Sequence, residues 1–514
     1  MKLNLPSLAM SLVFLFQWTP LQARTLYLST TGNDAAPFTH GSEFATLGRA
    51  VDSLAAGDTL IVRNGVHTGG VITPALSGTE SAPIVIRGES LGAIIDTSRN
   101  LDALRLDHSS HIRVEGLTFR HATRAGLGII NCNHITVKNC VMADNGRWGI
   151  LTGFVDDALF EGNECYGSKA EHGIYHSNSG DRFIIRGNIS HHNAANGIHL
   201  NGDPEIPGGD GVLNYGLVEK NVIFENGAAA GGAGINMTHV QDVIVRNNLI
   251  YDNHAGGFTY YQDAGTSDQA SKRALIMNNT VYFKANDRRV VNIAPSSEKV
   301  VLVNNILVAS NNYEVYQVWS DNPASIICDY NVLWGVDQGR IASISDTRNY
   351  TLDDWRKFRK NDLNSIYGDP RFTSAGQADF RPADSSPAVD AGAPLDTVKA
   401  LVGRLGGMEW ILAQLDSLPQ QDLRGRTRPV GKAPDIGAIE IGSDPQSLYD
   451  FNSDGRFSIA DAVRLIILGI RNPADPRADI DSDGLYSVSD VIRLLRILAG
   501  TLTRSTAGAD AIQL

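Results

Sequence analysis

Long apolar runs and cysteines are scarce in this sequence. After residue 23 no stretch is long and apolar enough to span a bilayer. Four cysteines occur in 514 residues, widely spaced and never in a CxxC arrangement, which excludes a disulfide-dense scaffold and a CxxC metal site. In an exported protein these thiols could pair, but we favour unpaired, buried side chains that act as small apolar groups, at Cys132, Cys140, Cys165 and Cys328.

Basic residues are too few and too scattered for a nucleic-acid-binding surface. Lys and Arg number 44 against 56 Asp and Glu, which gives a formal net charge of −12. The acidic balance fits bound cations or simple solubility. Glycine is abundant, at 51 residues, and aromatic residues make up 7% of the chain. This composition is typical of a protein built from strands and tight turns.

The first 23 residues have the order of a secretory signal peptide. Lys2 supplies the positive charge, residues 8–16 (LAMSLVFLF) form the apolar segment, and Pro20 ends it. Ala23 is the expected last residue before cleavage. We therefore predict a signal peptide at 1–23 and a secreted, extracellular mature protein without a membrane span.

One short pattern, apolar–x–apolar–x–x–Asn–apolar, recurs between residues 134 and 335 at spacings of 24 to 33 residues. Its asparagines are Asn139, Asn163, Asn188, Asn221, Asn248, Asn279, Asn305 and Asn331. A repeat of this length, made of short β-branched segments, predicts a solenoid of strands. Because asparagine bonds to neighbouring backbone and tolerates left-handed φ, we interpret these residues as structural turn residues.

A second repeated row consists of glycines, four of which begin a Gly-Ile step. They are Gly149, Gly173, Gly197, Gly234 and Gly257. Alternation along a strand then assigns the following side chains to opposite faces. The expected inward residues are Ile150, Ile174, Ile198, Ile235 and Phe258. The expected outward residues, stacked on one face, are Leu151, Tyr175, His199, Asn236 and Thr259.

Changes in pattern divide the chain into segments. They are a signal peptide (1–23), an N-terminal cap with the first coils (24–95), the regular coils of the solenoid (96–335), its closing segment (336–441), a linker (442–449), a C-terminal module of different composition (450–500) and a tail (501–514). An amphipathic helix within 44–54 would cover the open end of the solenoid. In the closing segment we predict a helical stretch at 397–418, and we expect Asp390, Asp422 and Asp435 to hold turns.

Two coils carry insertions, at 201–214 and 261–273, each directly after a Gly-row strand. They come from nearby coils, so we expect them to lie side by side, in a position where function is usually placed. The candidate catalytic residues are His199, Asp203, Asp210, Lys272 and Arg273. The candidate substrate-binding residues are Tyr175, Asn201, Asn236, Tyr261 and Asp263. His199 and Lys272 are candidate bases and Arg273 a cation, while the loop carboxylates would either hold calcium or act as acid and base.

Near the C-terminus one twelve-residue pattern occurs twice, DFNSDGRFSIAD at 450–461 and DIDSDGLYSVSD at 479–490. Oxygen-bearing side chains stand at positions 1, 3, 5, 9 and 12 with Gly at position 6, which is the spacing of a calcium loop. The predicted ligands of two Ca²⁺ ions are Asp450, Asn452, Asp454, Arg456 (through its carbonyl), Ser458 and Asp461, then Asp479, Asp481, Asp483, Leu485 (through its carbonyl), Ser487 and Asp490.

These duplicated loops, which end in Asp and are each followed by one short amphipathic helix, resemble a dockerin module over residues 450–499. The resemblance implies that the module folds on binding calcium and that its partner is a cohesin-type domain. A calcium-stabilised tail without a partner is the alternative.

The remainder of the chain resembles secreted right-handed parallel β-helix proteins, many of which act on polysaccharides. The resemblance rests on APIVIRGES (82–90) at the start of the coils and on GDPRF (368–372), SPAVDAG (386–392) and PDIGAIE (434–440) in the closing segment. It implies an all-β, right-handed parallel β-helix solenoid, followed here by the small α-helical dockerin-like module. The aspartate cluster of the calcium-dependent pectate lyases and the acidic pair of polygalacturonases are not evident.

Three functions are compatible with this organisation. The first is cleavage of an acidic, uronate-containing polysaccharide by β-elimination, with a catalytic Ca²⁺ as an option. The second is a glycoside hydrolase that uses a pair of carboxylates. The third is a non-catalytic carbohydrate-binding or scaffold protein. The dockerin-like module favours an enzyme, and the uronate substrate follows from analogy of fold.

Overall fold

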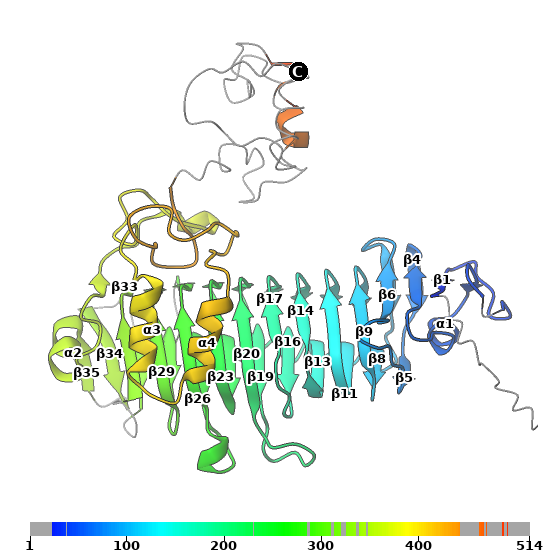
Figure 1. Ribbon diagram of the computed structural model, residues 1–514, viewed down its shortest axis with the longest axis horizontal. Coiled ribbons are helices and arrows are strands. Elements are labelled where there is room, and N and C mark those ends of the chain that lie inside the picture. Colours follow the sequence, from blue (N-terminus) through cyan, green and yellow to red (C-terminus); the bar gives the residue numbers. More distant parts are fainter. Residues whose placement is uncertain are drawn as a thin grey trace, which may run out of the picture.

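A computed structural model describes residues 23–442 except 38, 230, 285–287, 310–312, 320–324, 336–338 and 346–347, together with 462–466, 469, 486–487 and 491. The described body is an elongated solenoid of short parallel strands (Figure 1). The prediction of an all-β parallel solenoid is therefore confirmed. Hydrogen-bonded strands are one coil apart in sequence, as in the pairing of Ile174 with Ile198 and of Ile198 with Ile235.

Three parallel sheets run along the solenoid, and we number them in the order in which a coil visits them. The first sheet contains the Gly-row strands. They are β5 (Val71–Pro74), β8 (Asp102–Asp107), the first part of β11 (Ala125–Lys138), β13 (Trp148–Asp156), β16 (Ile174–Ser177), β19 (Ile198–Asn201), β22 (Ala233–Thr238), β25 (Gly256–Tyr261), β28 (Val291–Ile293), β31 (Tyr316–Val318) and β34 (Arg340–Ile344).

The second and third sheets lie on either side of the Asn repeat. The second-sheet strands are β1 (Thr25–Leu28), β3 (Thr59–Val62), β6 (Ile84–Gly88), β9 (Ser110–Glu115), the second part of β11, β14 (Leu159–Glu161), β17 (Ile184–Arg186), β20 (Leu213–Glu219), β23 (Val240–Arg246), β26 (Lys272–Met277), β29 (Glu298–Val303) and β32 (Ile326–Asp329). The third-sheet strands are β4 (Gly65–Thr68), β7 (Ala93–Asp96), β10 (Thr118–Arg120), β12 (Val141–Ala143), β15 (Glu164–Tyr166), β18 (Ile189–His191), β21 (Val222–Phe224), β24 (Leu249–Tyr251), β27 (Thr280–Tyr282), β30 (Ile306–Val308), β33 (Val332–Trp334) and β36 (Ile366–Tyr367).

Short elements close the ends and cover the sides of the solenoid. The strands are β2 (Glu43–Phe44), β35 (Arg348–Thr351), β37 (Phe372–Ser374) and β38 (Asp379–Pro382). The α-helices are α1 (Leu47–Asp52), α2 (Leu352–Arg359), α3 (Leu395–Gly403) and α4 (Glu409–Ser417), and the 3₁₀ turns are η1 (Ser267–Gln269) and η4 (Ala375–Gln377). The helical stretch expected at 397–418 is thus two helices, because Gly406 and Gly407 adopt φ of 59° and 68° between them.

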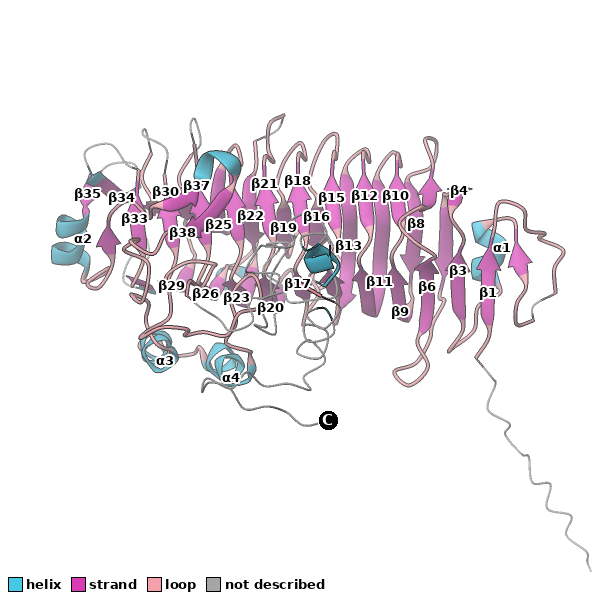
Figure 2. Cartoon of the chain, turned by 90° about the horizontal axis from the view of Figure 1, so that it is seen from above, coloured by secondary structure: helices cyan, strands magenta, loops and turns pink. Residues whose placement is uncertain are grey.

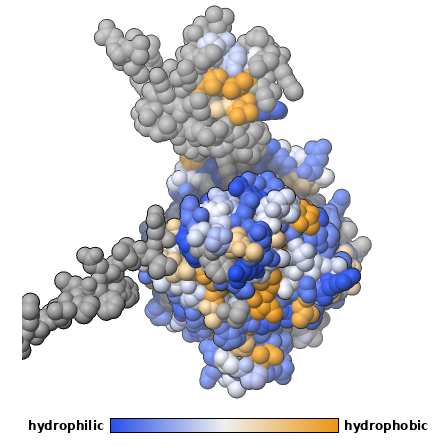
Figure 3. Space-filling view, turned by 90° about the vertical axis from the view of Figure 1, so that its right-hand side faces the viewer, coloured by the Kyte–Doolittle hydropathy of each residue, from blue (hydrophilic) through white to orange (hydrophobic). Residues whose placement is uncertain are grey.

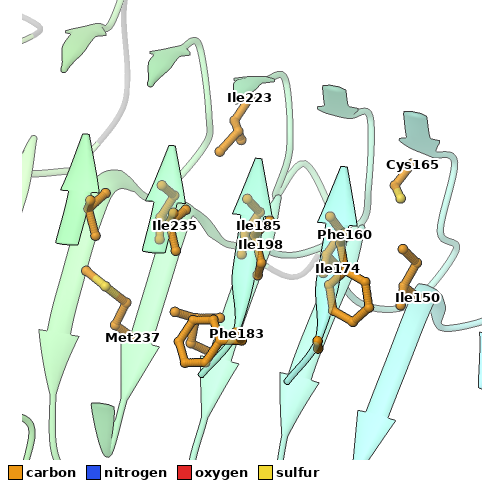
Figure 4. Close-up of a cluster of buried hydrophobic side chains, with 14 of the residues drawn as sticks. Ile150, Phe160, Cys165, Ile174, Phe183, Ile185, Ile198, Ile223, Ile235 and Met237 are labelled. Carbon is orange, nitrogen blue, oxygen red and sulfur yellow. The ribbon is translucent and has the colours of Figure 1, made fainter. Parts of the chain in front are cut away.

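The interior is filled by inward side chains from all three sheets. Figure 4 shows Ile150, Ile174, Ile198 and Ile235 following one another along the first sheet, as alternation predicted. Each fully buried side chain of this kind contributes about 1.5–3 kcal/mol. The four cysteines are buried, unpaired thiols, which confirms the favoured prediction. Burial raises the pKa of the Cys140 thiol to about 12.

The asparagine repeat forms a hydrogen-bonded ladder along the solenoid. The side-chain oxygen of Asn221 accepts the backbone N–H and the side-chain N–H of Asn188, at 2.9 and 3.0 Å. The Asn188 amide also donates to the Phe160 carbonyl at 2.9 Å. The buried ladder residues are Asn163, Asn188, Asn221, Asn248, Asn279, Asn305 and Asn331. The ladder therefore satisfies backbone and side-chain polar groups inside the molecule.

Asn139 does not belong to this ladder. It is exposed, and in its coil the ladder position is Cys140, whose backbone N–H donates to the Asn163 side chain at 3.0 Å. The expectation that the ladder asparagines take left-handed φ is wrong, because the residue before each of them turns the chain. Asn139 itself has φ 53°, Gly162 has φ 67° and Lys220 has φ 58°.

A second ladder lies five residues further along the chain. The Asn226 side-chain oxygen accepts the backbone and side-chain N–H groups of Asn193, at 3.1 and 2.8 Å, and Asn253 accepts those of Asn226. The sequence analysis missed this ladder, although the five-residue offset from the first is visible in the sequence. The two ladders flank the third sheet and fix the register of its strands.

The outer faces of the three sheets have different surroundings (Figures 1 and 2). Helices α3 and α4 lie on the second sheet, where Val398 and Ile411 pack against an apolar row that includes Ile244. Strands β37 and β38 lie on the third sheet, where the Phe380 ring meets the Tyr251 ring at 4.9 Å. The outer face of the first sheet is instead bordered by the two insertions.

Helix α1 closes the N-terminal end, as predicted. Its residues Leu47, Ala50 and Val51 are buried, and the Thr46 side chain caps it by accepting the Arg49 N–H. Figure 3 looks onto this end, where polar residues cover much of the described surface.

In the closing segment the carboxylate of Asp422 accepts the backbone N–H groups of Arg424, Arg426 and Glu440, which confirms its expected role in a turn.

Residues 1–22, residues 443–449 of the linker and most of the dockerin-like module lie outside the described residues. Of the predicted calcium ligands the structure describes Ser487, which is exposed. Residues 462–466 are helical, at the place where a helix was expected to follow the first loop. Within the described part of the chain, no helix has the length and apolar character needed to cross a membrane.

Candidate functional site

The outer face of the first sheet carries the predicted row of stacked side chains. The register aligns Tyr175 with His199, His199 with Asn236, Asn236 with Thr259, and Thr259 with Asn292. Two residues further along each strand, Asn201 of β19 aligns with Thr238 of β22, which aligns with Tyr261 of β25. The expected orientation of this row is therefore confirmed, and it brings together most of the predicted substrate-binding residues.

A pair of histidines is the centre of this face. The His199 Nδ1 atom lies 2.9 Å from the His172 Nε2 atom, and the two rings meet edge to face at 4.6 Å. On its other side the His172 Nδ1 atom accepts the backbone N–H of Asn196 at 3.1 Å. The His199 Nε2 atom is shielded from solvent and has no hydrogen-bond partner among the described residues.

Both imidazoles are neutral at ordinary pH. Burial lowers the pKa of His199 to about 4, and the nearby charge of Asp263 opposes part of this shift. Burial, with smaller contributions from His199 and Arg147, lowers the pKa of His172 well below the usual value of a histidine. A neutral histidine next to a polar cavity is a frequent component of active sites.

Aromatic side chains continue the face on either side of the histidine pair. The Tyr175 ring lies 5.1 Å from the His199 ring and 5.5 Å from the Trp148 ring, and its hydroxyl accepts the side-chain N–H of Asn201 at 3.1 Å. The Tyr261 hydroxyl accepts from the Asn236 amide at 3.3 Å. Tyrosines that are apolar in body and hydrogen-bonded at the tip are suited to contact sugar rings.

A polar cavity of about 430 Å³ lies next to the histidine pair on the same face. Its lining includes Asn196, Asn236, Thr259, Tyr261, Arg288 and Asn292. The volume is within the range of small-molecule sites. Most of the polar side chains that line the cavity are uncharged hydrogen-bond donors and acceptors. The cavity adjoins the histidine pair through two of its lining residues, Asn236, which is the register partner of His199, and Asn196, whose backbone N–H donates to His172.

Two arginines stand at the cavity wall directly before β28. Arg289 forms an ion pair with Glu314 at 3.6 Å, and its guanidinium lies over the Tyr313 ring at 5.7 Å. Arg288 is exposed, and no ion pair to it is found within the described part of the chain. An exposed guanidinium at this position is suited to contact an anionic ligand in the cavity.

The two insertions lie side by side, as expected. The Gln269 side chain of the second donates to the Asp210 carbonyl of the first at 2.8 Å. His239, whose side chain is fully buried, connects to the second insertion through Asp263 at 2.8 Å and the Gln269 carbonyl at 2.8 Å. Burial and the charges of Asp263 and Glu205 raise the pKa of Asp203 above its ordinary value. The loop carboxylates thus form one acidic group at the edge of the site.

Lys272 and Arg273 belong to a different part of the molecule. Both lie on β26 in the second sheet. Lys272 is paired with Glu298 at 3.7 Å, and the Arg273 guanidinium is held by Asp242 at 2.8 Å and by the Gln241 side chain at 2.7 Å. The structure therefore does not bring these two residues together with His199, and their ion pairs give them structural roles.

No group of three or more His, Cys, Asp or Glu side chains with the geometry of a metal site occurs among the described residues. Asp203 and Asp210 of the first insertion remain candidates for catalytic Ca²⁺ ligands or acid–base groups on the sequence argument alone. The two Ca²⁺ ions predicted for the C-terminal module involve loops that lie outside the described residues.

Two residues of this site, His172 and Arg288, were not among the candidates predicted from the sequence. His172 was not part of the candidate cluster, but it precedes the Gly-Ile step of its coil by one residue, next to the outward row. Arg288 is the first arginine of the sequence Asp-Arg-Arg-Val at 287–290. It stands three residues before the inward position Val291. The cavity wall at this position was not predictable, because it depends on where the preceding corner places the arginine.

One further histidine, His176, is buried in the core and gives a testable pH dependence. Its ring packs between Phe160 and Phe183, the Thr152 hydroxyl lies 2.8 Å from its Nδ1 atom, and burial lowers its pKa to about 3. In the unfolded chain a histidine titrates near 6.5, so the unfolded state binds more protons below that pH and stability falls as pH falls. The loss from this residue is about 2 kcal/mol at pH 5.

We therefore expect His176→Asn, which retains an acceptor near Thr152, to flatten the loss of stability between pH 6.5 and 5. Denaturant unfolding at a series of pH values measures the slope, and the slope is independent of any constant loss that the substitution causes. His108→Asn, at a position whose side chain is 69% exposed, is the matched control. An unchanged slope in the His176 variant would show that the histidine is protonated in the folded protein.

The three-sheet solenoid places the protein in the class of right-handed parallel β-helix proteins. The chain belongs to the family of Pel9A-like proteins with a right-handed β-helix region, whose model matches residues 26–292. This match confirms the right-handed parallel β-helix expected from the resemblance.

The chain is also similar to individual proteins. The chain is 25% identical over 457 residues to the uncharacterized protein YwoF of Bacillus subtilis (strain 168), a match that covers 71% of this chain and 92% of YwoF. Among solved structures it is similar to the pectate lyase Pel9A, with a TM-score of 0.51, 15% identity, and coverage of 82% of this chain and 98% of that one. A rhamnogalacturonan lyase is similar with a TM-score of 0.45, 16% identity, and coverage of 76% and 100%. At 15% identity the likeness to Pel9A shows the fold alone.

Proposed function

We propose that the protein is a secreted enzyme that cleaves an extracellular acidic, uronate-containing polysaccharide by β-elimination. The observation that carries the proposal is the arrangement on the outer face of the first sheet, where a neutral histidine pair lies beside a polar cavity with Arg288 at its wall. Membership of the Pel9A-like family and a fold shared with a pectate lyase support a polysaccharide substrate.

β-Elimination on a uronate requires three contributions. The charge of the sugar carboxylate is neutralised, a base removes the C5 proton, and the negative charge that develops on the carboxylate is stabilised. In the proposal Asp263 removes the proton, and His199 contacts the reacting sugar through Nε2 once the side chains that cover this atom move aside. Arg288, at the other end of the strands, binds the carboxylate of a neighbouring uronate. Asp263 suits the role of base because its side chain is 54% exposed and is held by His239.

The sugars on either side of the reacting unit lie along the row of outward side chains. Tyr175, Asn201, Asn236 and Tyr261 are the proposed contacts, because their hydroxyl and amide groups already form pairs that face the same side of the sheet. A chain that follows this row runs parallel to the solenoid, across successive coils. Aromatic rings and amide groups are the usual contacts of sugar rings and hydroxyls in such sites.

A glycoside hydrolase is the second candidate, and one observation favours it. Asp203 and Asp263 interact electrostatically across the two insertions, and the pKa of Asp203 is raised by burial and by Asp263. A carboxyl group whose pKa is raised, next to a second carboxylate, is the equipment of a glycosidase, in which Asp203 would be the acid. The products distinguish this reaction from elimination.

The deciding experiment is product analysis on a panel of pectic, alginate, glycosaminoglycan and neutral glycans. Elimination produces a new reducing end and an unsaturated uronate that absorbs in the ultraviolet, in equal amounts. Reducing ends without this absorbance would sink the lyase proposal in favour of hydrolysis. Glycan binding without either product would identify a binding protein. Parallel reactions with Ca²⁺ and with a chelator report whether the loop carboxylates use a catalytic Ca²⁺.

For the C-terminal module we propose two Ca²⁺ ions and docking onto a cohesin-type domain. The support is the duplicated loop spacing at 450–461 and 479–490. Calorimetry of the full chain should show a transition of the module that calcium raises and a chelator removes, because metal binding is coupled to folding in such loops. A chelator-insensitive profile would contradict the calcium assignment.

A further inference from the structure

The hydrogen bonds around His172 fix where its proton lies. Its Nδ1 atom faces the backbone N–H of Asn196 at 3.1 Å, and a backbone N–H can only donate. The Asn196 side-chain nitrogen also faces this Nδ1 atom, at 3.3 Å. That amide is held in this orientation because its oxygen accepts the Ala233 N–H at 2.7 Å. The Nδ1 atom of His172 is therefore an acceptor, and the proton of the neutral ring is on Nε2.

The position of the proton on His172 in turn determines the tautomer of His199. The protonated Nε2 atom of His172 faces the His199 Nδ1 atom at 2.9 Å, so this Nδ1 atom accepts. The other group near His172 Nε2 is the Glu171 carboxylate at 3.5 Å, which also favours a proton on that nitrogen. Glu171 is already engaged by the Trp148 indole N–H at 3.1 Å and by Arg147. Of the two contacts of His172 Nε2, the one to His199, at 2.9 Å, is the shorter.

We propose that His172 is a positioning residue that holds His199 in the tautomer with its proton on Nε2, so that His199 acts on the substrate as a neutral hydrogen-bond donor. This inference rests on the proposed function and assigns the role of one residue within it. His199 was a candidate base on the sequence argument, and this hydrogen-bond pattern favours the opposite role.

The chemical consequence concerns the charge that develops on the substrate. A neutral Nε2–H group donates to an oxygen on which negative charge grows, without the cost of carrying a buried cation. In β-elimination that oxygen belongs to the uronate carboxylate, whose charge rises as the C5 proton leaves. The C5 proton goes to a different group, Asp263 in our proposal, and His199 retains its own proton throughout this step. The electron pair of the C5–H bond then forms the C4=C5 double bond as the C4–O bond breaks, and the leaving oxygen takes up a proton from Asp263 or from water.

The first test reads the tautomer directly. NMR of the full-length protein labelled at the histidine ring nitrogens, assigned with His199→Gln, should show His199 with Nε2 protonated and Nδ1 unprotonated at neutral pH. His172→Ala should produce exchange between both tautomers, because the donor to Nδ1 is gone. A protonated Nδ1 atom in the wild type, or an unchanged His199 signal in His172→Ala, would overturn the inference.

The second test uses a conservative variant. In His172→Gln the side-chain oxygen can accept from Asn196 and the side-chain NH₂ can donate to His199 Nδ1, so the tautomer and most of kcat should be retained. In His172→Ala we expect kcat to fall by about tenfold or more with KM little changed, as part of the roughly 10²–10³ that one hydrogen-bond donor to a developing charge contributes. Equal losses in both variants would contradict a positioning role.

These readouts separate the inference from the function on which it rests. If the protein cleaves none of the glycans, the proposed function fails, while the NMR measurement still reports the tautomer. If cleavage occurs and the His199 proton is on Nδ1, the proposed function stands and the inference fails. His108→Gln, at an exposed position, serves as the control for both measurements.

Discussion

Replacement of His199 by alanine is expected to lower kcat by about 100- to 1,000-fold, because it removes a donor from the reacting centre. KM should change little, since the donor acts mainly when charge develops on the substrate. Initial rates on the best substrate of the glycan panel measure both constants. The denaturation midpoint of the variant must stay close to that of the wild type for the comparison to hold.

His254→Ala is the matched control for this prediction. His254 is exposed at the corner between β24 and β25, outside the proposed site. We expect its kinetic constants to equal those of the wild type. If His199→Ala retained full activity, the reacting centre would lie elsewhere, and the loop carboxylates around Asp203 would become the first alternative.

The largest expected effect on stability comes from Asn221→Leu in the first ladder. The substitution removes the acceptor of two N–H groups of Asn188 and the donor to the Ile185 carbonyl, all inside the molecule. An unsatisfied buried polar group costs about 1–3 kcal/mol, so the total loss should exceed about 3 kcal/mol. Because a solenoid transmits stability between neighbouring coils, the midpoint of chemical unfolding should fall and the transition broaden.

Asn139→Gly provides the comparison for the ladder. Asn139 has the same residue type in the same sequence pattern, but it is exposed with φ 53°, a conformation that glycine adopts freely. We expect little change in the unfolding midpoint. Equal losses for the two variants would show that corner geometry, and not the ladder of hydrogen bonds, stabilises the coils.

The fold was predictable because each coil repeats the same short sequence pattern at a nearly constant spacing. The spacing of the asparagines and glycines defined the coils, and alternation placed Ile174 inward and Tyr175 outward, as found. The position of the left-handed residue was not predictable from the pattern alone. Both Asn163 and the residue before it were compatible with a corner, and the choice depends on which side chain the neighbouring coil can accept as a partner.

The candidate site was predictable in part. The outward row and the two long coils identified the face that carries His199 and the cavity. Lys272 and Arg273 were assigned to it from their place in the sequence, but the second insertion ends just before them, and they start a strand of another sheet. His172 and Arg288 were missed because each lies just before a strand, where alternation no longer determines the direction of a side chain.

The central claim is that an acidic glycan binds at the cavity on the outer face of the first sheet. Calorimetric titration of a uronate oligosaccharide into His199→Ala, which binds but turns over slowly, measures this directly. We predict that adding Arg288→Gln to that variant weakens binding about tenfold or more, which corresponds to about 1.4 kcal/mol for a lost charged contact. Equal affinity of the single and double variants would contradict the claim and place the glycan elsewhere on the solenoid.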